Sequence, residues 1–136
     1  MPDQPRHILF LCVHNSARSQ MAEGIARSLA PDSVKVSSAG SQPTRVQPLA
    51  VQALQEIGID ISGQRVKGLD AIDNESVDLV ITLCDDQVCP YFPGRVEQFH
   101  WPLDDPAAAD NLDAYRRTRD ELIERLKRLF QEPEAK

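Results

Sequence analysis

The sequence predicts an α/β protein, a three-layer α/β/α sandwich around a parallel sheet of about four strands. Short apolar runs of strand length alternate along the chain with segments of helical periodicity, and this alternation is typical of a parallel sheet covered by helices. The chain has 136 residues, which is the size of one domain with one core. Since no repeat or linker interrupts the alternation, we expect a single domain over residues 1–136.

Four short segments rich in apolar or β-branched residues are predicted to be strands. They cover residues 7–13, 33–38, 78–83 and 96–101. Three further segments show helical spacing of their apolar residues or a helix-start signal. They cover residues 17–29, 48–56 and 112–130. Loops or turns are expected at residues 39–43, 84–95 and 102–106.

The ends of these helices are marked by residues with special backbone preferences. Pro31 closes the first helix, while Pro48 suits the first turn of the second and Gly58 ends it. Asp110 or Asn111 can cap the last helix. That helix carries a single apolar stripe for the core, made of Leu112, Tyr115, Leu122, Leu126 and Leu129.

The composition argues against several classes of partner. The formal net charge is −6 and no basic run exceeds Arg116–Arg117, so nucleic-acid binding is not expected. No apolar segment is as long as a membrane span, and residues 1–7 are too polar for a signal peptide. We therefore expect a cytoplasmic protein without a membrane partner. No apolar stripe is left over, which favours a monomer.

Three chemically active residues lie just beyond predicted strands. Cys12 ends the first strand, Cys84 follows the third, and Asp105 follows the fourth. In parallel sheets, ligands bind outside the carboxyl ends of the strands, where the order of the chain reverses. The sequence therefore predicts a functional site at this edge.

The segment from Cys12 to Ser19 has the form C-x5-R-S between a strand and a helix. The unpaired amides and the positive dipole end of a helix N-terminus bind anions, and the same field favours a cysteine thiolate. Arg18 adds a planar fork for two oxygens of an oxyanion, and Ser19 offers the sulfur a hydroxyl. The predicted oxyanion-binding loop comprises Val13, His14, Asn15, Ser16, Ala17, Arg18 and Ser19. The alternative is a buried strand-end cysteine beside a solvated arginine.

The chain has three cysteines, an odd number that argues against a disulfide framework. The histidines, His7, His14 and His100, show no paired spacing with them, so neither a metal site nor a cofactor is expected. Cys84 and Cys89 stand five residues apart. They could be core residues, a metal half-site or a redox pair.

The loop and its continuation through Gly24 resemble arsenate reductases built on the low-molecular-weight protein tyrosine phosphatase fold. The resemblance covers nearly the whole chain, with further shared motifs at residues 38–40, 58–62, 80–84, 89–90 and 101–107. It implies a flavodoxin-like strand order of 2-1-3-4. It also implies reduction of arsenate to arsenite, and hence arsenic detoxification.

The resemblance assigns a role to each candidate residue. Cys12 would attack arsenic while Arg18 and the loop amides hold the oxyanion, and Asp105 would protonate the departing oxygen. Cys84 would then attack Cys12, and Cys89 would attack Cys84. Thioredoxin is the expected electron donor, with glutaredoxin or a low-molecular-weight thiol as the alternative. Phosphate and sulfate would compete with arsenate.

Two features depart from some of these reductases. The relay cysteines are spaced C-x4-C, a shorter gap than in some relatives. Lys67 occupies a position where some relatives carry an Asp that helps to bind potassium. We infer that its ammonium takes the place of that ion, close to Asn15, Glu23 and Ser38. The alternative is an exposed loop lysine.

Two other functions share part of this site. A low-molecular-weight protein tyrosine phosphatase would use Cys12, Arg18 and Asp105, but such enzymes place aromatic residues after the Asp-Pro pair. Here residues 107–109 are alanines, and a phosphatase needs neither of the relay cysteines. A non-catalytic oxyanion-binding protein would need only the loop.

Overall fold

The computed structural model describes residues 7–12, 17–40, 44–72, 76–83, 96–103, 106–109 and 111–131. The strands are β1 (His7–Cys12), β2 (Lys35–Gly40), β3 (Leu79–Thr82) and β4 (Glu97–His100). The helices are α1 (Arg18–Leu29), α2 (Pro48–Gln55), α3 (Pro106–Ala109) and α4 (Leu112–Gln131), and a 3-10 turn, η1, covers Leu69–Ala71. None of these helices is both long and apolar enough to span a bilayer.

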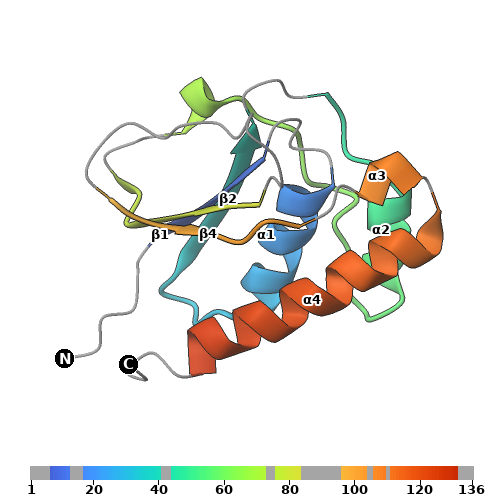
Figure 1. The fold of residues 1–136 in the computed structure, drawn as a ribbon. Coiled ribbons are helices and arrows are strands. Elements are labelled where there is room, and N and C mark those ends of the chain that lie inside the picture. Colours follow the sequence, from blue (N-terminus) through green and yellow to red (C-terminus); the bar gives the residue numbers. More distant parts are fainter. Residues whose placement is uncertain are drawn as a thin grey trace.

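The four strands form one parallel sheet in the order β2-β1-β3-β4. The predicted fold class and strand order are therefore confirmed. The strand β1 is central and pairs with β2 on one side and β3 on the other (Figure 1). Because all strands run in the same direction, their carboxyl ends meet at one edge.

Both faces of strands β1 and β3 are buried, as their apolar runs predict. Alternate residues of β1 belong to two different clusters, with Phe10 in the larger one and Leu9 and Leu11 in the smaller. Helices α1 and α4 lie against the face of the larger cluster, and α2 packs beside both (Figure 1). The smaller cluster is completed by Val77 and Val80.

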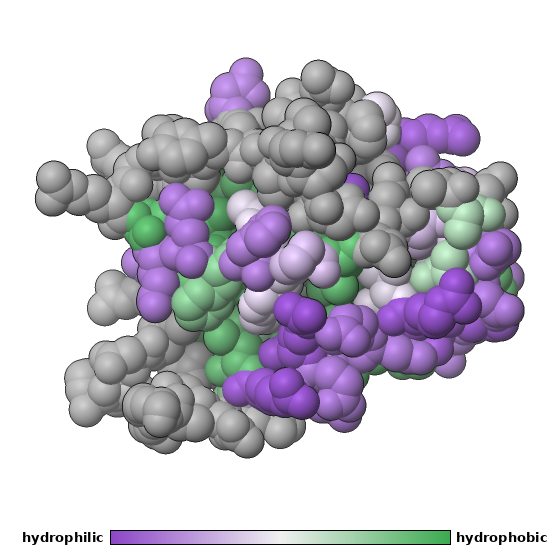
Figure 2. Space-filling view, viewed as in Figure 1, coloured by the Kyte–Doolittle hydropathy of each residue, from purple (hydrophilic) through white to green (hydrophobic). Residues whose placement is uncertain are grey.

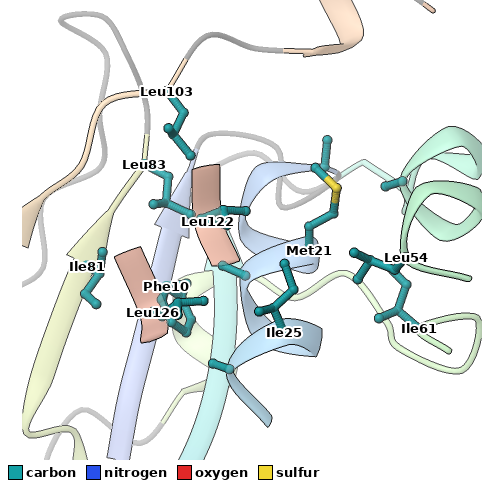
Figure 3. Close-up of a cluster of buried hydrophobic side chains, with 14 of the residues drawn as sticks. Phe10, Met21, Ile25, Leu54, Ile61, Ile81, Leu83, Leu103, Leu122 and Leu126 are labelled. Carbon is teal, nitrogen blue, oxygen red and sulfur yellow. The ribbon is translucent and has the colours of Figure 1, made fainter. Parts of the chain in front are cut away.

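The larger core confirms the predicted stripe of α4. Tyr115, Leu122 and Leu126 are fully buried, while Leu112 and Leu129 pack at its margin. Figure 3 shows Leu122 and Leu126 meeting side chains from α1 and from the strands. At about 25 cal/mol per Å² of apolar area, each fully buried leucine or phenylalanine contributes about 2–3 kcal/mol to this packing.

The predicted helix ends are largely confirmed. Gly58 has φ +84°, the left-handed conformation in which a helix commonly stops at glycine. The side-chain Oδ1 of Asn111 accepts a hydrogen bond from the Ala114 N–H at 2.9 Å, which makes Asn111 the N-cap of α4. Asp110, the alternative cap, lies outside the described residues.

Strand β2 and helix α3 differ from the prediction. We predicted a strand at 33–38, but β2 runs on to Gly40, because parallel pairing with β1 continues to the Cys12–Gly40 pair. The Gly40 N–H also donates to the Lys67 carbonyl at 3.0 Å. Pro106, the last residue of the expected turn at 102–106, is the first residue of the short helix α3, which local sequence did not reveal.

The outer side of α4 carries charged side chains along its length (Figure 2). Two of its arginines reach the end of α2, where Arg116 and Arg119 form ion pairs with Glu56 at 2.6 and 2.7 Å. Hydrogen bonds from Arg116 first, and from Arg119, lower the pKa of Glu56 from 4.5 to about 2. These contacts tie α2 to α4 at an exposed site.

We expect Glu56→Gln to reduce stability in a pH-dependent way. A lowered carboxyl pKa stabilises the fold above the unfolded value of 4.5, and this contribution is lost as the pH falls towards about 2. The difference in free energy of unfolding between the two proteins should therefore be present at pH 6 and shrink between pH 4.5 and 2. Urea unfolding followed by circular dichroism measures it.

Glu124→Gln is the matched control, since Glu124 is an exposed glutamate of α4 without a hydrogen bond or ion pair to the described residues. Its effect should be small at every pH. If the loss of stability in Glu56→Gln did not change with pH, Glu56 would not stabilise the fold through its lowered pKa.

Candidate active site at the carboxyl edge of the sheet

The predicted nucleophile lies at the end of the central strand. Cys12 is the last residue of β1 and is 2% exposed. Its Sγ lies 2.9 Å from Oγ of Ser19, a fully buried residue in the first turn of α1. A hydroxyl that donates to sulfur stabilises a thiolate, the form in which cysteine reacts. The structure thus brings together two residues that the sequence had placed in one site.

The beginning of α1 can accept an anion. Helix α1 starts at Arg18, its N-cap is Ala17, and no side chain caps it. Its first turn contains no acidic residue that would neutralise the positive end of the dipole. This end of a twelve-residue helix lies next to the end of β1. It is the arrangement expected for an oxyanion-binding loop.

Arg18 is buried, with an exposed fraction of 6%. Its Nη1 donates to the carbonyl oxygen of Leu103 at 2.9 Å and to that of Leu83 at 3.4 Å. The alternative of a solvated helix arginine is therefore wrong. One guanidinium links the start of α1 to the chain beyond β3 and beyond β4.

The chain beyond β3 is held firmly before it leaves the sheet. The Leu83 N–H donates to the Leu11 carbonyl at 2.9 Å, and the Leu103 N–H donates to the Leu83 carbonyl at 3.1 Å. Figure 3 shows the side chains of Leu83 and Leu103 at the same end of the core. The backbone up to Leu83, the residue before Cys84, is thus fixed next to β1, the strand that ends in Cys12.

Several predicted site residues lie outside the described residues. They are Val13, His14, Asn15, Ser16, Cys84, Cys89 and Asp105. Their proposed roles stay predictions. The residues that the structure does describe, Cys12, Ala17, Arg18 and Ser19, occupy the junction of β1 and α1 as expected.

A second buried charge lies on α1. Glu23 is 5% exposed, and its carboxylate accepts hydrogen bonds from Ser38 and Arg27, each at 2.5 Å. The Lys67 Nζ lies 3.6 Å from the same carboxylate and donates to the Arg65 carbonyl at 2.8 Å. The Lys67 ammonium therefore lies beside Glu23, as predicted, and the same carboxylate binds Ser38. Asn15, the third predicted neighbour, lies outside the described residues, and the replacement of a potassium ion stays a prediction. The side chain of Lys67 is 27% exposed rather than fully solvated.

The segment that delivers Lys67 is held on α1 by two glutamines. The Gln20 amide donates to the Arg65 carbonyl at 3.0 Å, and the Gln64 amide donates to Gln20 Oε1 at 2.7 Å. Gly24 permits this close approach, since a Cβ there would clash with Ile61. Sequence reasoning missed both glutamines, because no local pattern distinguishes a buried glutamine from a surface one.

Two described histidines lie at opposite ends of the sheet. His7, at the amino end, is buried between the hydroxyls of Ser37 and Ser76. His100, at the carboxyl end of β4, lies 2.7 Å from the Thr82 hydroxyl. Within the described ranges, no three His, Cys, Asp or Glu side chains are grouped so as to hold a metal ion.

Comparisons with known proteins agree with this arrangement. The family model of low molecular weight phosphotyrosine protein phosphatases matches residues 7–136. An arsenate reductase of Halalkalibacterium halodurans is 46% identical over 127 residues, which cover 88% of this chain and 91% of that protein. The solved structure of an arsenate reductase in its phosphate-binding state superposes with a TM-score of 0.84 at 34% identity, covering 94% and 98% of the two chains.

A second similar structure is that of a thioredoxin-dependent arsenate reductase of Corynebacterium glutamicum. It has a TM-score of 0.73 and 31% identity, and the match covers 96% of this chain and 63% of that one.

We expect Ser19→Ala to slow the reaction of Cys12 with iodoacetamide at pH 6. A hydrogen bond to a charged group contributes about 1.5–3 kcal/mol, so the rate should fall by about tenfold or more. Ser28→Ala is the matched control, because that hydroxyl, on the same helix, donates to the Ile25 carbonyl instead. Equal rates in all three proteins would show that the Ser19 hydroxyl does not support the thiolate.

We expect the unchanged chain to unfold at the same temperature in potassium and in sodium salts of equal ionic strength. The Lys67 ammonium already lies beside the Glu23 carboxylate, so an added potassium ion gains little there. Lys67→Asp replaces that cation by a second carboxylate and should make stability potassium-dependent. If the unchanged chain unfolded at a higher temperature in potassium than in sodium, the Lys67 ammonium would not take the place of a potassium ion.

Proposed function

This chain belongs to the low molecular weight phosphotyrosine protein phosphatase family, and we propose that within it the chain acts as an arsenate reductase. The observation that carries the proposal is the buried link from Arg18 to Leu83 and Leu103. It holds the oxyanion arginine against the chain that continues into Cys84 and against the chain that continues into Asp105. The similarity to proteins named arsenate reductases supports the same assignment.

The first step forms a bond between sulfur and arsenic. Arg18 and the amides at the start of α1 would hold arsenate, whose charge the buried site favours. The Cys12 thiolate would attack the arsenic atom. Asp105 would give its proton to the departing oxygen, which leaves as water. The same cradle would accept phosphate or sulfate as competitors.

The second step transfers two electrons to arsenic. The Cys84 thiolate would attack the Cys12 sulfur, and the electron pair of the broken sulfur–arsenic bond would stay on arsenic, which leaves as arsenite. A disulfide then joins Cys12 and Cys84. Its formation needs the chain beyond β3 close to β1, which the Leu83–Leu11 hydrogen bond supports. Neighbouring strands are about 4.8 Å apart, which lies within the separation of Cα atoms that a disulfide spans.

The third step moves the disulfide outward. Cys89 would attack Cys84, which frees the Cys12 thiolate and leaves a Cys84–Cys89 disulfide. An external dithiol would then reduce this disulfide by thiol exchange. We assign this role to thioredoxin, by similarity to the thioredoxin-dependent reductase of Corynebacterium glutamicum. The need for three reduced thiols is the basis for proposing a cytoplasmic location.

We also propose that the chain works as a monomer. Ile57, at the end of α2, is the one large hydrophobic side chain exposed among the described residues. A single such residue is common on monomeric proteins and does not form an interface.

The family to which the chain belongs makes a phosphatase the second candidate. That activity would use Cys12, Arg18 and Asp105 on a phosphate ester. The chain after Pro106 argues against it, since three alanines follow where a phosphotyrosine ring would need an aromatic wall. Cys84 and Cys89 would also have no role.

We expect arsenate to drive NADPH consumption through thioredoxin reductase and thioredoxin, and Cys84→Ser to abolish it. The variant retains the nucleophile and the acid, so weak hydrolysis of p-nitrophenyl phosphate should survive. Cys89→Ser, the matched control, should release at most one arsenite per chain and then stop. If all three proteins hydrolysed the phosphate ester at the same rate and none consumed NADPH with arsenate, the chain would be a phosphatase. No chemistry in any of them would indicate an oxyanion-binding protein.

A further inference from the structure

A pocket of about 300 Å³ lies between α3, the first half of α4 and the chain that follows β4. Figure 1 shows α3 leading into α4 at this end of the helix. The volume is at the lower end of the range for sites that bind small molecules. Cys12, Arg18 and Ser19 do not line it, so the pocket is separate from the oxyanion site.

The floor of the pocket suits an apolar group. It consists of Leu103, Pro106, Ala114 and Thr118, which are all buried. The Thr118 hydroxyl already donates to the Ala114 carbonyl at 3.1 Å, and the Ala114 N–H already donates to Asn111. The Leu103 N–H is bonded to the backbone beyond β3, and a proline has no N–H to offer. A polar group on this floor would therefore lose water without gaining a donor.

The rim of the pocket carries a cation that is available to a ligand. Arg117 is exposed, and it forms no hydrogen bond or ion pair with the part of the chain that the structure describes. Glu121, the other charged residue of the rim, accepts a hydrogen bond from Arg125 Nε at 2.7 Å. The same Arg125 guanidinium lies 5.7 Å from the centroid of the Trp101 ring. The carboxylate of the rim is thus neutralised, and the positive charge of Arg117 is not.

Leu103 connects the pocket to the oxyanion arginine. Its side chain lines the floor, while its carbonyl accepts the hydrogen bond from Arg18 Nη1 at 2.9 Å. A ligand packed against Leu103 favours the position in which that carbonyl meets the guanidinium. Arg18 is then already oriented when an oxyanion arrives, and a site that is ordered in advance binds more tightly.

We propose that this pocket is a regulatory site for a small monocarboxylate with an apolar body, and that its occupation strengthens oxyanion binding at Arg18. The apolar body enters between α3 and α4. The carboxylate stays at the mouth, where its two oxygens accept hydrogen bonds from the planar guanidinium of Arg117. The regulatory part rests on the proposed function, because it needs an oxyanion at Arg18. Benzoate has this chemistry and serves as the probe.

The first test locates the ligand. Benzoate is titrated into the reduced full chain labelled with nitrogen-15, and the backbone amides are followed by NMR. The amides of Ala109, Ala114 and Thr118 should shift together, with a dissociation constant of about 1 mM for a ligand of this size. Benzyl alcohol has a similar ring without the carboxylate and should bind at least about threefold more weakly. Equal affinity for the two ligands, or no shift at these amides, would overturn the proposal.

The second test changes the mouth of the pocket. Arg117→Gln should weaken benzoate binding at least about threefold and leave benzyl alcohol unaffected, because it removes only the charge. Ala109→Leu, at the exposed rim, should weaken both ligands, since the added side chain takes up part of the space.

Arg128→Gln is the matched control. Arg128 is an exposed arginine of the same helix, also without a hydrogen bond or ion pair to the described residues, and it does not line the pocket. This variant should bind both ligands like the unchanged chain. If Arg117→Gln and Arg128→Gln bound benzoate equally well, Arg117 would not hold the carboxylate and the proposal would fail.

The third test measures the coupling between the two sites. Phosphate is titrated with and without saturating benzoate, and its binding is read from the Arg18 and Ser19 amides. Benzoate should raise the affinity for phosphate about fivefold, and phosphate should raise that for benzoate by the same factor. Competition between the two would place benzoate in the oxyanion loop. Either competition or an unchanged phosphate affinity would overturn the regulatory role.

The outcomes separate this site from the proposed function. If the coupling is present but the chain does not reduce arsenate, the reductase function fails and the regulatory site stands. If phosphate does not bind under any condition, the oxyanion site and the regulatory role both fail, while the benzoate shifts still decide whether the pocket binds a carboxylate. Thermal unfolding of each variant by circular dichroism checks that the fold is retained.

Discussion

The buried guanidinium of Arg18 sets the geometry of the carboxyl edge of the sheet. A charge taken out of water costs several kcal/mol unless acceptors replace the lost solvent. The carbonyls of Leu83 and Leu103 supply such acceptors, because both lie where the pairing of β3 with β4 comes to its end. Without either carbonyl, the buried guanidinium would lack one of the hydrogen bonds that replace water. The Arg18 side chain therefore holds together the start of α1, the chain after β3 and the chain after β4.

A second buried charge holds the opposite flank of α1. The Glu23 carboxylate joins β2 through Ser38 and meets the cations of Arg27 and Lys67. Hydrogen bonds and opposite charges together make such burial tolerable. Helix α1 is thus anchored by its arginine at the nucleophile and by its glutamate at β2. Both anchors limit how far the start of α1 can move from Cys12.

Much of the fold and part of the site were predictable because their signals are local. The apolar run of β1 predicted a buried strand, and the C-x5-R-S spacing predicted that Cys12, Arg18 and Ser19 share one loop and helix start. The predicted C-terminal end of β2 was wrong. The local sequence of Ala39 and Gly40 is typical of a loop, and they become part of the strand only by pairing with β1. The short helix α3 was missed for a similar reason, as four residues carry no periodicity.

The sequence by itself determined the order of elements, the strand–helix junction at Cys12 and the side of α4 that enters the core. These follow from periodicity and from backbone preference, which act over a few residues. Only the tertiary structure decided that Arg18 donates hydrogen bonds to the carbonyls of Leu83 and Leu103, and that His100 is hydrogen-bonded to Thr82. Such partners lie many residues apart in the chain. Parallel strands bring them together, because all of their carboxyl ends meet at one edge.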